Sequence, residues 1–475
     1  MPHSQLNGSA RAAEHAIIRN RPAVNFFEGA LLGNGGLGVV VCLRPDAVMV
    51  HFGHNNVWDI RLAEENREKI GTFQDVFERV KRIPDTHHLL TDDAWYDDYQ
   101  RMAQENYRKP YPRPFPCGTL VFGFDRREVE ALGYHLNLAD GICSVHLLVG
   151  GIRQTLRLFT DMSQDHLWMN MTDENGISIA APFNRVRLIP DPTTPDEFPE
   201  YTVSTPDEGE TLSFRQVLPF LPPREDDAPR PSHHPKDRAF RLRVCLPGPL
   251  TKASRMTVDG IPETMNDLER SMAASREFIA VVQLEEGLAS DLPDDPVYTQ
   301  PASLPDLFED ASRSSLRSWQ HYWARSAVAL EDTQLERTWY RNLYFLNCAV
   351  REGVTCPGLF ANWSYKDIGT SWHGDYHMNY NTQQPFWAAF SSNHVDKHLP
   401  YVDMVHRALP VSQAWARDYY EMRGAFFPHS LYPVEMTMNP YPVPTWGWEV
   451  FETPWTVQSL WWHYTYTGDR EFLEH

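Results

Sequence analysis

The chain has 475 residues, of which 42% are apolar, and it carries a formal net charge of −20 at pH 7. This length exceeds one ordinary domain, and the apolar fraction supplies enough material for two sizeable cores. The acidic balance, without any block rich in Lys and Arg, excludes nucleic acid and anionic membrane surfaces as expected partners.

The first twenty residues contain no apolar run long enough for a signal-peptide core, and no run of about 18 apolar residues follows. We therefore expect a soluble, cytoplasmic protein. The cysteines show neither C-x-x-C spacing nor close pairing with histidine, which favours buried reduced thiols over disulfides or zinc ligands. They are Cys42, Cys117, Cys143, Cys245, Cys348 and Cys356.

The first part of the chain alternates short β-branched or aromatic segments with Gly and Pro, which predicts an antiparallel sandwich over residues 1–290. The clearest hairpin is Ser144–Asp161, where two alternating segments flank Gly150-Gly151, a pair suited to a tight turn. Two insertions interrupt the pattern. Residues 59–107 are charged and helix-like, and residues 190–236, rich in Pro and acidic residues, are expected to form a mobile loop.

A Pro- and Asp-rich stretch precedes a helical pattern near Leu304, so residues 291–330 are expected to form a linker. Behind a cap at Asp332 or Thr333, apolar residues recur every three or four positions up to Arg351, which predicts a packed helix. Its expected buried stripe is Leu335, Trp339, Leu343, Leu346 and Val350.

Further helices are predicted in residues 331–475. One runs from about Val395 to Tyr420, with Pro410 as the point where it is expected to break. The next is capped by Thr453-Pro454, and Gly468 ends it. Its expected buried residues are Val457, Leu460, Trp461 and Tyr464. Asp469 then caps a helix of about two turns, too short to be stable alone, so the chain is expected to end inside a domain.

The segment from Trp372 to Trp387, WHGDYHMNYNTQQPFW, combines amides, imidazoles, a carboxylate and aromatic rings. Binding a sugar requires this mixture, because rings stack on the apolar face of a pyranose while polar groups satisfy its hydroxyls. Tryptophan is concentrated in the same part of the chain, with 12 of the 15 between Trp319 and Trp462. The sequence therefore predicts a carbohydrate site here.

Several segments together resemble glycoside hydrolase family 95, the inverting α-L-fucosidases and their α-L-galactosidase relatives. They are ALLGNGGLGVVV with NNVWDIR, the block HLNLADGICSVHLLVGGIRQTLRLFTDMSQDHLWMNM, NLYFLNCAVREG, the spacing Trp372, Tyr376, Asn379-x-Asn381 and Trp387, RGAFFPH, and LWWHYTYTGDREFL. The resemblance implies a β-super-sandwich, a helical linker and an (α/α)6 barrel, of which residues 331–475 are the first part. It also implies an oligosaccharide or other glycoside as substrate, water as nucleophile and no cofactor.

In that family the asparagines of N-x-N hold the attacking water, so the resemblance implies this role for Asn379 and Asn381. Because an amide is not basic, carboxyl groups must supply the proton and the base. The family's acid and base come later in its sequence, so the chain is expected to lack a C-terminal segment and to be inactive alone. The expected substrate-binding residues are Trp363, Trp372, His373, Asp375, His377, Trp387 and His429. The local carboxylates, none assigned as the acid, are Asp367, Asp375, Glu435, Glu449 and Glu452.

Three departures from the family pattern leave the identity of the substrate sugar undetermined. TQQPF at residues 382–386 replaces the usual T-E-M-N-Y, Trp462 stands where a Glu is usual, and Pro428 interrupts a pair of histidines. An α-L-fucoside, an α-L-galactoside and another glycoside all remain candidate substrates.

Alternative interpretations exist for several motifs. Residues 33–38 satisfy G-x-G-x-x-G, but the β run that follows rejects a dinucleotide site, which needs a helix there. His373, Asp375 and His377 alternate, so on an extended segment they would share one face and form a metal site. A carbohydrate-binding protein without catalysis is another alternative. A phosphorylase is the last, although no basic or helix-N-terminal cradle for phosphate is visible.

Other aromatic and imidazole residues have open roles. His233-His234 is expected to be solvated, whereas Trp455, Trp461 and Tyr464 are expected in the core. Trp446 and Trp448 lie on a loop rich in Pro and Gly, where they are candidate sugar platforms. One cluster either lends residues to the sugar site or ends strands, and it consists of His51, His54, Asn55, Asn56 and Trp58.

Overall fold

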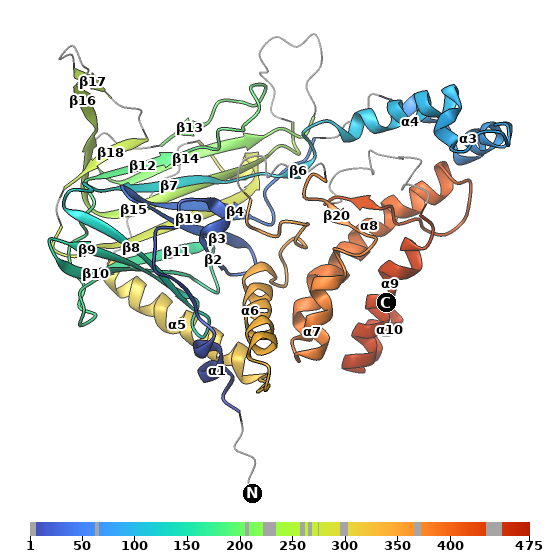
Figure 1. Cartoon of the computed structure of the whole chain (residues 1–475). Helices are drawn as coiled ribbons and strands as arrows, with labels where there is room; N and C mark the ends of the chain where they lie inside the picture. Colours follow the sequence, from blue (N-terminus) through green and yellow to red (C-terminus); the bar gives the residue numbers. More distant parts are fainter. Residues whose placement is uncertain are drawn as a thin grey trace, which may run out of the picture.

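The computed structural model describes residues 6–61, 66–204, 209–221, 234–256, 262–264, 268–273, 275–294, 303–364, 372–433 and 449–475. An antiparallel sheet comes first, and a group of helices follows beside it (Figure 1). Among the described residues, no helix has the length and apolar character needed to cross a membrane.

The main sheet joins fifteen strands, and its longest path has the order β1-β8-β9-β10-β11-β19-β15-β18-β12-β7-β4-β3-β2, with β14 and β13 attached to β15. The strands are β1 (Ile17–Arg19), β2 (Ala30–Gly33), β3 (Leu37–Arg44), β4 (Ala47–His54), β7 (Gly118–Gly123), β8 (Val129–Asn137), β9 (Ile142–Val149), β10 (Ile152–Thr160), β11 (His166–Thr172), β12 (Arg185–Ile189), β13 (Thr202–Val203), β14 (Gly209–Leu218), β15 (Arg238–Lys252), β18 (Glu269–Met272) and β19 (Ile279–Leu288). Short pairs lie outside it: β5 (Trp58–Asp59) with β6 (Arg113–Pro114), and β16 (Ser254–Met256) with β17 (Pro262–Thr264).

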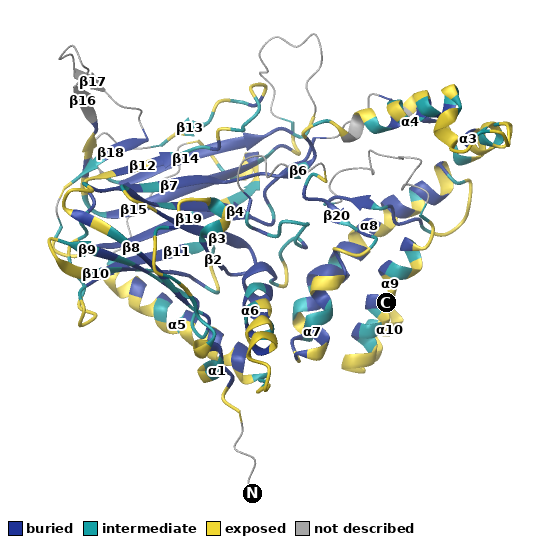
Figure 2. Ribbon diagram, viewed as in Figure 1, coloured by how far each residue is buried: buried dark blue, intermediate teal, exposed yellow. Residues whose placement is uncertain are grey.

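The sheet folds over a continuous apolar core, which Figure 2 shows as buried strands. The hairpin predicted at Ser144–Asp161 is confirmed, because β9 pairs antiparallel with β10 across Gly150 and Gly151, both at positive φ. The cysteines are buried free thiols, as expected. The predicted antiparallel sandwich is therefore confirmed.

One of the two predicted insertions is helical, and the other contains a strand. Residues 59–107 contain α2 (Arg67–Ile70), α3 (Phe73–Val80), η2 (Leu90–Asp92) and α4 (Ala94–Tyr107), as predicted. The expected mobile loop over 190–236 is wrong for residues 209–218, which form β14 and pair with β15. The alternation of buried Leu212 and Phe214 builds this strand, and the flanking Pro and acidic residues hid that pattern. Residues 222–233, including His233, lie outside the described residues.

The remaining helices and 3-10 turns are α1 (Gly8–Glu14), η1 (Phe26–Glu28), η3 (Ala289–Asp291), α5 (Leu304–Ala324), α6 (Thr333–Ala349), η4 (Gln384–Phe386), α7 (Trp387–Ser391), η5 (Val395–His398), α8 (Leu399–Asp418), α9 (Glu452–Thr467) and α10 (Arg470–Glu474). Within the expected linker, α5 packs on the sheet through Phe308, which contacts Phe159 and Trp168. The domain limits 1–290, 291–330 and 331–475 stay a prediction.

The helix α6 begins where the sequence predicts, because Asp332 caps it by accepting from the backbone of Gln334 and Leu335. The expected stripe is partly wrong, since Leu335 is 60% exposed. The buried face instead includes Tyr340 and Tyr344, whose rings pack under the sheet together with α5.

The helix α8 runs through Pro410 without the expected break. It starts after η5 and ends at Asp418, and its buried residue Trp415 packs against the helical insertion. That packing stabilises a helix that a proline alone would weaken.

The predicted buried stripe of α9 is partly wrong, since Leu460 and Tyr464 are half-buried and the fully buried residues lie on the adjacent face. Val457 and Trp461 are exposed, while Thr456, Ser459 and His463 are buried. The neighbouring α8 presents polar groups: the Tyr401 hydroxyl donates to Thr456 O at 2.8 Å. Thr453 is not the cap; its hydroxyl accepts from the Phe427 backbone at 3.1 Å. Gly468 ends the helix in the left-handed region and Asp469 caps α10, both as predicted.

Amide side chains and glycines join the sheet to the helical region. Gly38 and Gly53 face each other across β3 and β4, and the backbone of Asn362 lies directly over both. The buried Asn362 amide donates to Leu37 O and Cys348 O, each at 3.0 Å. The glycines of the G-x-G-x-x-G motif thus allow close backbone approach between the sheet and the segment that follows α6.

The cluster of His51 to Trp58 also serves this junction. The Asn55 amide donates to Gly35 O and Ala349 O, and Asn56 accepts from the Thr355 backbone. His54 contacts Asp165 at 3.1 Å, His51 contacts Thr119 at 2.8 Å, and the Trp58 indole donates to Asn55 O. These contacts favour the strand-end interpretation of the cluster.

Candidate functional site

Two segments that the sequence marked separately lie side by side. The strand β20 (Tyr376–His377) pairs antiparallel with β21 (Ser430–Leu431), and the Met378 backbone donates to His429 O at 2.8 Å. The end of RGAFFPH therefore lies beside the centre of the aromatic and amide-rich segment.

The start of that segment is a turn and not a strand. His373 and Gly374 have φ values of 54° and 64°. The alternation that would bring His373, Asp375 and His377 to one face needs extended backbone, so this arrangement of the metal alternative is not formed. Asp375 and His377 do come together, with His377 Nδ1 3.1 Å from Asp375 Oδ1.

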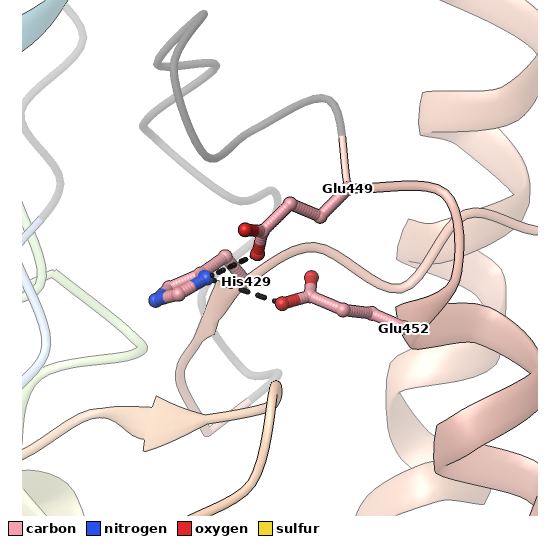
Figure 3. Close-up of side chains that lie close together, drawn as sticks. All are labelled: His429, Glu449 and Glu452. Atoms are coloured by element: carbon pink, nitrogen blue, oxygen red, sulfur yellow. Dashed lines mark hydrogen bonds and ion pairs between the residues drawn. The ribbon is translucent and has the colours of Figure 1, made fainter.

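A line of polar contacts continues from Asp375 through two imidazoles. Asp375 is fully buried, and His377 Nε2 lies 3.0 Å from His429 Nε2. On its other side, His429 Nδ1 is 2.7 Å from Glu449 Oε2 and 3.1 Å from Glu452 Oε1. Figure 3 shows both carboxylates directed at this nitrogen.

The environment shifts the pKa of two members of this line. Burial raises the pKa of Glu452 to about 7, with the neighbouring Glu449 adding to the effect and His429 opposing it. Burial alone would lower the pKa of His429, but contacts with Glu452 and Glu449 outweigh it, so the pKa of His429 is raised. The group is arranged to hold a positive charge between two carboxylates.

The two asparagines lie on the turn that follows β20. Asn379 is half-buried, and its Oδ1 atom accepts no hydrogen bond from the part of the chain that the structure describes. Asn381 is exposed. Their role in holding water stays a prediction.

Aromatic rings surround this turn unevenly. Trp387 contacts Tyr380, Trp455 and Trp462 with ring centroids 5.6 to 6.2 Å apart. Trp372 is 49% exposed and lies 5.6 Å from the His377 ring. Trp363 instead donates from its indole to Leu32 O at 2.9 Å, a contact that ties it to the sheet.

A cavity of about 240 Å³ lies behind β20. Its lining includes Tyr376, Asn56, Trp58, Asp403 and Arg407. Since Tyr376 and His377 are consecutive in a strand, their side chains point to opposite faces, so His377 faces away from this cavity. The predicted sugar-binding residues are not among its lining residues.

The sequence named Glu449 and Glu452 among several carboxylates but did not connect them to His429. Their spacing of three residues at a helix start was the available signal. Of the other candidates, Asp367, Glu435, Trp446 and Trp448 lie outside the described residues.

The fold and the matched domains define the class of protein. Residues 17–215 match the Glycosyl hydrolase family 65, N-terminal domain, and residues 306–475 match the Glycosyl hydrolase family 95 catalytic domain. A sandwich joined to helices of the (α/α)6 type is a glycoside hydrolase architecture, which confirms the predicted fold class.

Within that class, the helical region over residues 306–475 is similar to the catalytic domain of glycoside hydrolase family 95. Over 132 residues the chain is 26% identical to "Alpha-L-fucosidase 2" of Arabidopsis thaliana. The aligned segment covers 28% of this chain and 15% of the relative.

Similar solved structures are all of low sequence identity, and the first of them shares the fold. A "Putative kojibiose phosphorylase from human microbiome" superposes with a TM-score of 0.53 at 9% identity, covering 96% of this chain and 57% of that one. A bacterial glucoamylase complexed with acarbose has a TM-score of 0.37 at 9% identity, covering 89% and 56%. The chain thus spans little more than half the length of these proteins.

Proposed function

We propose that the protein hydrolyses terminal α-linked sugars of the α-L-fucoside or α-L-galactoside kind with inversion at the anomeric carbon. The observation that carries the proposal is the family 95 match over residues 306–475, which contains the N-x-N pair on the turn after β20. The similarity to "Alpha-L-fucosidase 2" supports the choice of sugar.

In the proposed reaction, Asn379 and Asn381 hold a water molecule against the anomeric carbon. The water oxygen bonds to that carbon as the glycosidic C–O bond breaks, and the leaving oxygen takes a proton from a carboxylic acid. A second carboxylate accepts the proton of the water. The Asn379 Oδ1 atom, which accepts no hydrogen bond from the described residues, is suited to accept one from this water.

The proposed sugar contacts are Trp372, His373, His377, Trp387 and His429. Asp375 is fully buried and is proposed to act through its contact with His377, and Trp363 is more remote because its indole binds the sheet. The proton donor and base are assigned to the later carboxylates of the family and not to residues of this chain. The cytoplasmic location of the protein stays a prediction.

A second candidate function is carbohydrate binding without catalysis by the complete protein. Trp462, which stands where the family has a glutamate, contacts Trp387 and Phe390 with its ring and so fills that position with an indole. An indole supplies stacking surface for a sugar in place of an ionisable carboxylate, which favours binding at this position.

Hydrolysis and binding of aryl α-L-fucoside and α-L-galactoside separate these functions. They are measured on this chain and on the complete product of its reading frame. We expect turnover by the complete product, with the inverted anomer detected first by NMR, and its loss in N379A and N381A while sugar affinity persists. N25A, an exposed asparagine of the sheet region, is the matched control. Binding without turnover by the complete product would establish the second function, and full activity of N379A and N381A would reject the assigned water site.

A further inference from the structure

The glycosidase proposal gives His429 a role in sugar binding but gives none to the two carboxylates that face it. We propose that His429, Glu449 and Glu452 bind a divalent cation, with zinc as the ion that their chemistry fits best. This inference does not depend on the proposed hydrolysis.

Three ligand atoms from two separate segments converge on one point. One atom each of His429, Glu449 and Glu452 lies within 4.8 Å of the others. His429 directly precedes β21, whereas Glu449 and Glu452 lead into α9 (Figure 3). In a tetrahedral zinc site, bonds of about 2.0–2.2 Å hold ligand atoms roughly 3.3 Å apart. The 3.1 Å contact of His429 with Glu452 lies close to that spacing, and the 2.7 Å contact with Glu449 is about 0.6 Å shorter.

The hydrogen bonds behind His429 determine which of its nitrogens carries hydrogen. The buried Asp375 carboxylate can only accept, so His377 donates to it from Nδ1. The Nε2 atom of a neutral His377 then accepts from Nε2–H of His429, at 3.0 Å. The remaining nitrogen of a neutral His429, Nδ1, presents a lone pair to the carboxylates, which is the arrangement that outer-shell carboxylates impose on metal-binding histidines.

Glu452 provides the independent sign that a ligand is expected. Its side chain is fully buried, and neither carboxylate oxygen accepts a well-formed hydrogen bond from the described residues, although Oε1 lies 3.1 Å from His429 Nδ1. A buried carboxylate without such partners is costly. A proton on His429 neutralises one of the two carboxylates, whereas a divalent cation neutralises both.

The donor set selects the ion. Calcium and magnesium prefer sites made of oxygen atoms, whereas one imidazole nitrogen with two carboxylates suits zinc. Three protein ligands leave the fourth zinc position open. The Glu449 side chain is 31% exposed, so ion and water reach the site from that side.

Calorimetric titration of the chelator-treated 475-residue chain tests the proposal, with zinc, manganese and calcium chlorides in parallel. We expect one zinc per chain, bound more tightly than calcium. E452Q and H429Q should weaken zinc binding at least 100-fold, and H377Q, which acts through His429, should weaken it about 10–100-fold. H406A and E309Q change exposed residues elsewhere and should leave it unchanged.

Absorption at the zinc K-edge gives a second measurement that needs no variant. We expect one imidazole nitrogen and carboxylate oxygens at about 2.0–2.2 Å from the ion. Absence of zinc binding, calcium binding more tightly than zinc, unchanged affinity in E452Q and H429Q, or a coordination shell without imidazole would each overturn the proposal.

Discussion

The close approach of the Asn362 backbone to the sheet gives a quantitative prediction for G38A. A Cβ atom at Gly38 would lie 2.1 Å from Asn362 O and 2.6 Å from its carbonyl carbon. An ordinary contact needs about 3.2 Å, so backbone must move by roughly 1 Å in a close-packed region. Gly38 has no positive φ, so the cost comes from this overlap alone. We expect G38A to lower the free energy of unfolding by about 3 kcal/mol.

The assay is chemical unfolding of G38A and of a control variant, followed by tryptophan fluorescence. The matched control is G287A, since a Cβ at Gly287, also in a strand, meets nothing within 4 Å. The control should be neutral or stabilising by up to about 1 kcal/mol, because alanine restricts the unfolded chain. Equal unfolding midpoints for G38A and G287A would refute the argument that the glycine is required for contact between the sheet and the helical region.

Three more outcomes follow from the same junction and core. N362A, which removes the side-chain amide, should lower the free energy of unfolding by about 2 kcal/mol, or about 1 kcal/mol for each of the two hydrogen bonds lost. The loss is no larger because the Leu37 and Cys348 carbonyls each still accept from a backbone donor. A change below about 0.5 kcal/mol would contradict this. Burial, then the charge of Arg325, lowers the pKa of His394 to about 3, so the unfolded state binds more protons below its own pKa of about 6.5. The free energy of unfolding should therefore fall on acidification from about pH 6.5 towards 3, by about 1.4 kcal/mol per pH unit for this group. H394F keeps a ring stacked on Tyr322, and it should flatten this dependence when unfolding is measured at a series of pH values. W363F should cost about 1 kcal/mol of stability through its lost bond to Leu32 O while sugar affinity is unchanged, and a large fall in affinity would show that Trp363 binds sugar directly.

The sequence was informative where local chemistry decides structure. The Gly150-Gly151 hairpin, the Asp332 cap, the Gly468 terminus and the Asp469 cap depend on a few adjacent residues, and all were predicted. Predictions that depended on packing against an element distant in the sequence were less successful. The buried face of α9 was assigned to Val457 and Trp461 by hydrophobicity, yet the helix buries Thr456, Ser459 and His463, and Tyr401 of α8 donates to the backbone of Thr456.

The candidate site shows the same division. The sequence identified the segment 372–387 as a candidate sugar site and named Glu449 and Glu452 among the nearby carboxylates. It did not indicate that His429 lies against His377 on one side and against both carboxylates on the other, because these residues are separated by 52 and by 20 or more positions.

The sequence by itself determined the antiparallel sandwich, the helical region and the family resemblance, since strand alternation, turn glycines, helix caps and motif order are properties of neighbouring residues. Only the tertiary structure decided that Gly38 and Gly53 admit the Asn362 backbone, and that a buried glutamate meets His429 beside the paired asparagines. Contacts between distant segments depend on how whole elements pack, and no local pattern specifies the partner that an element will meet.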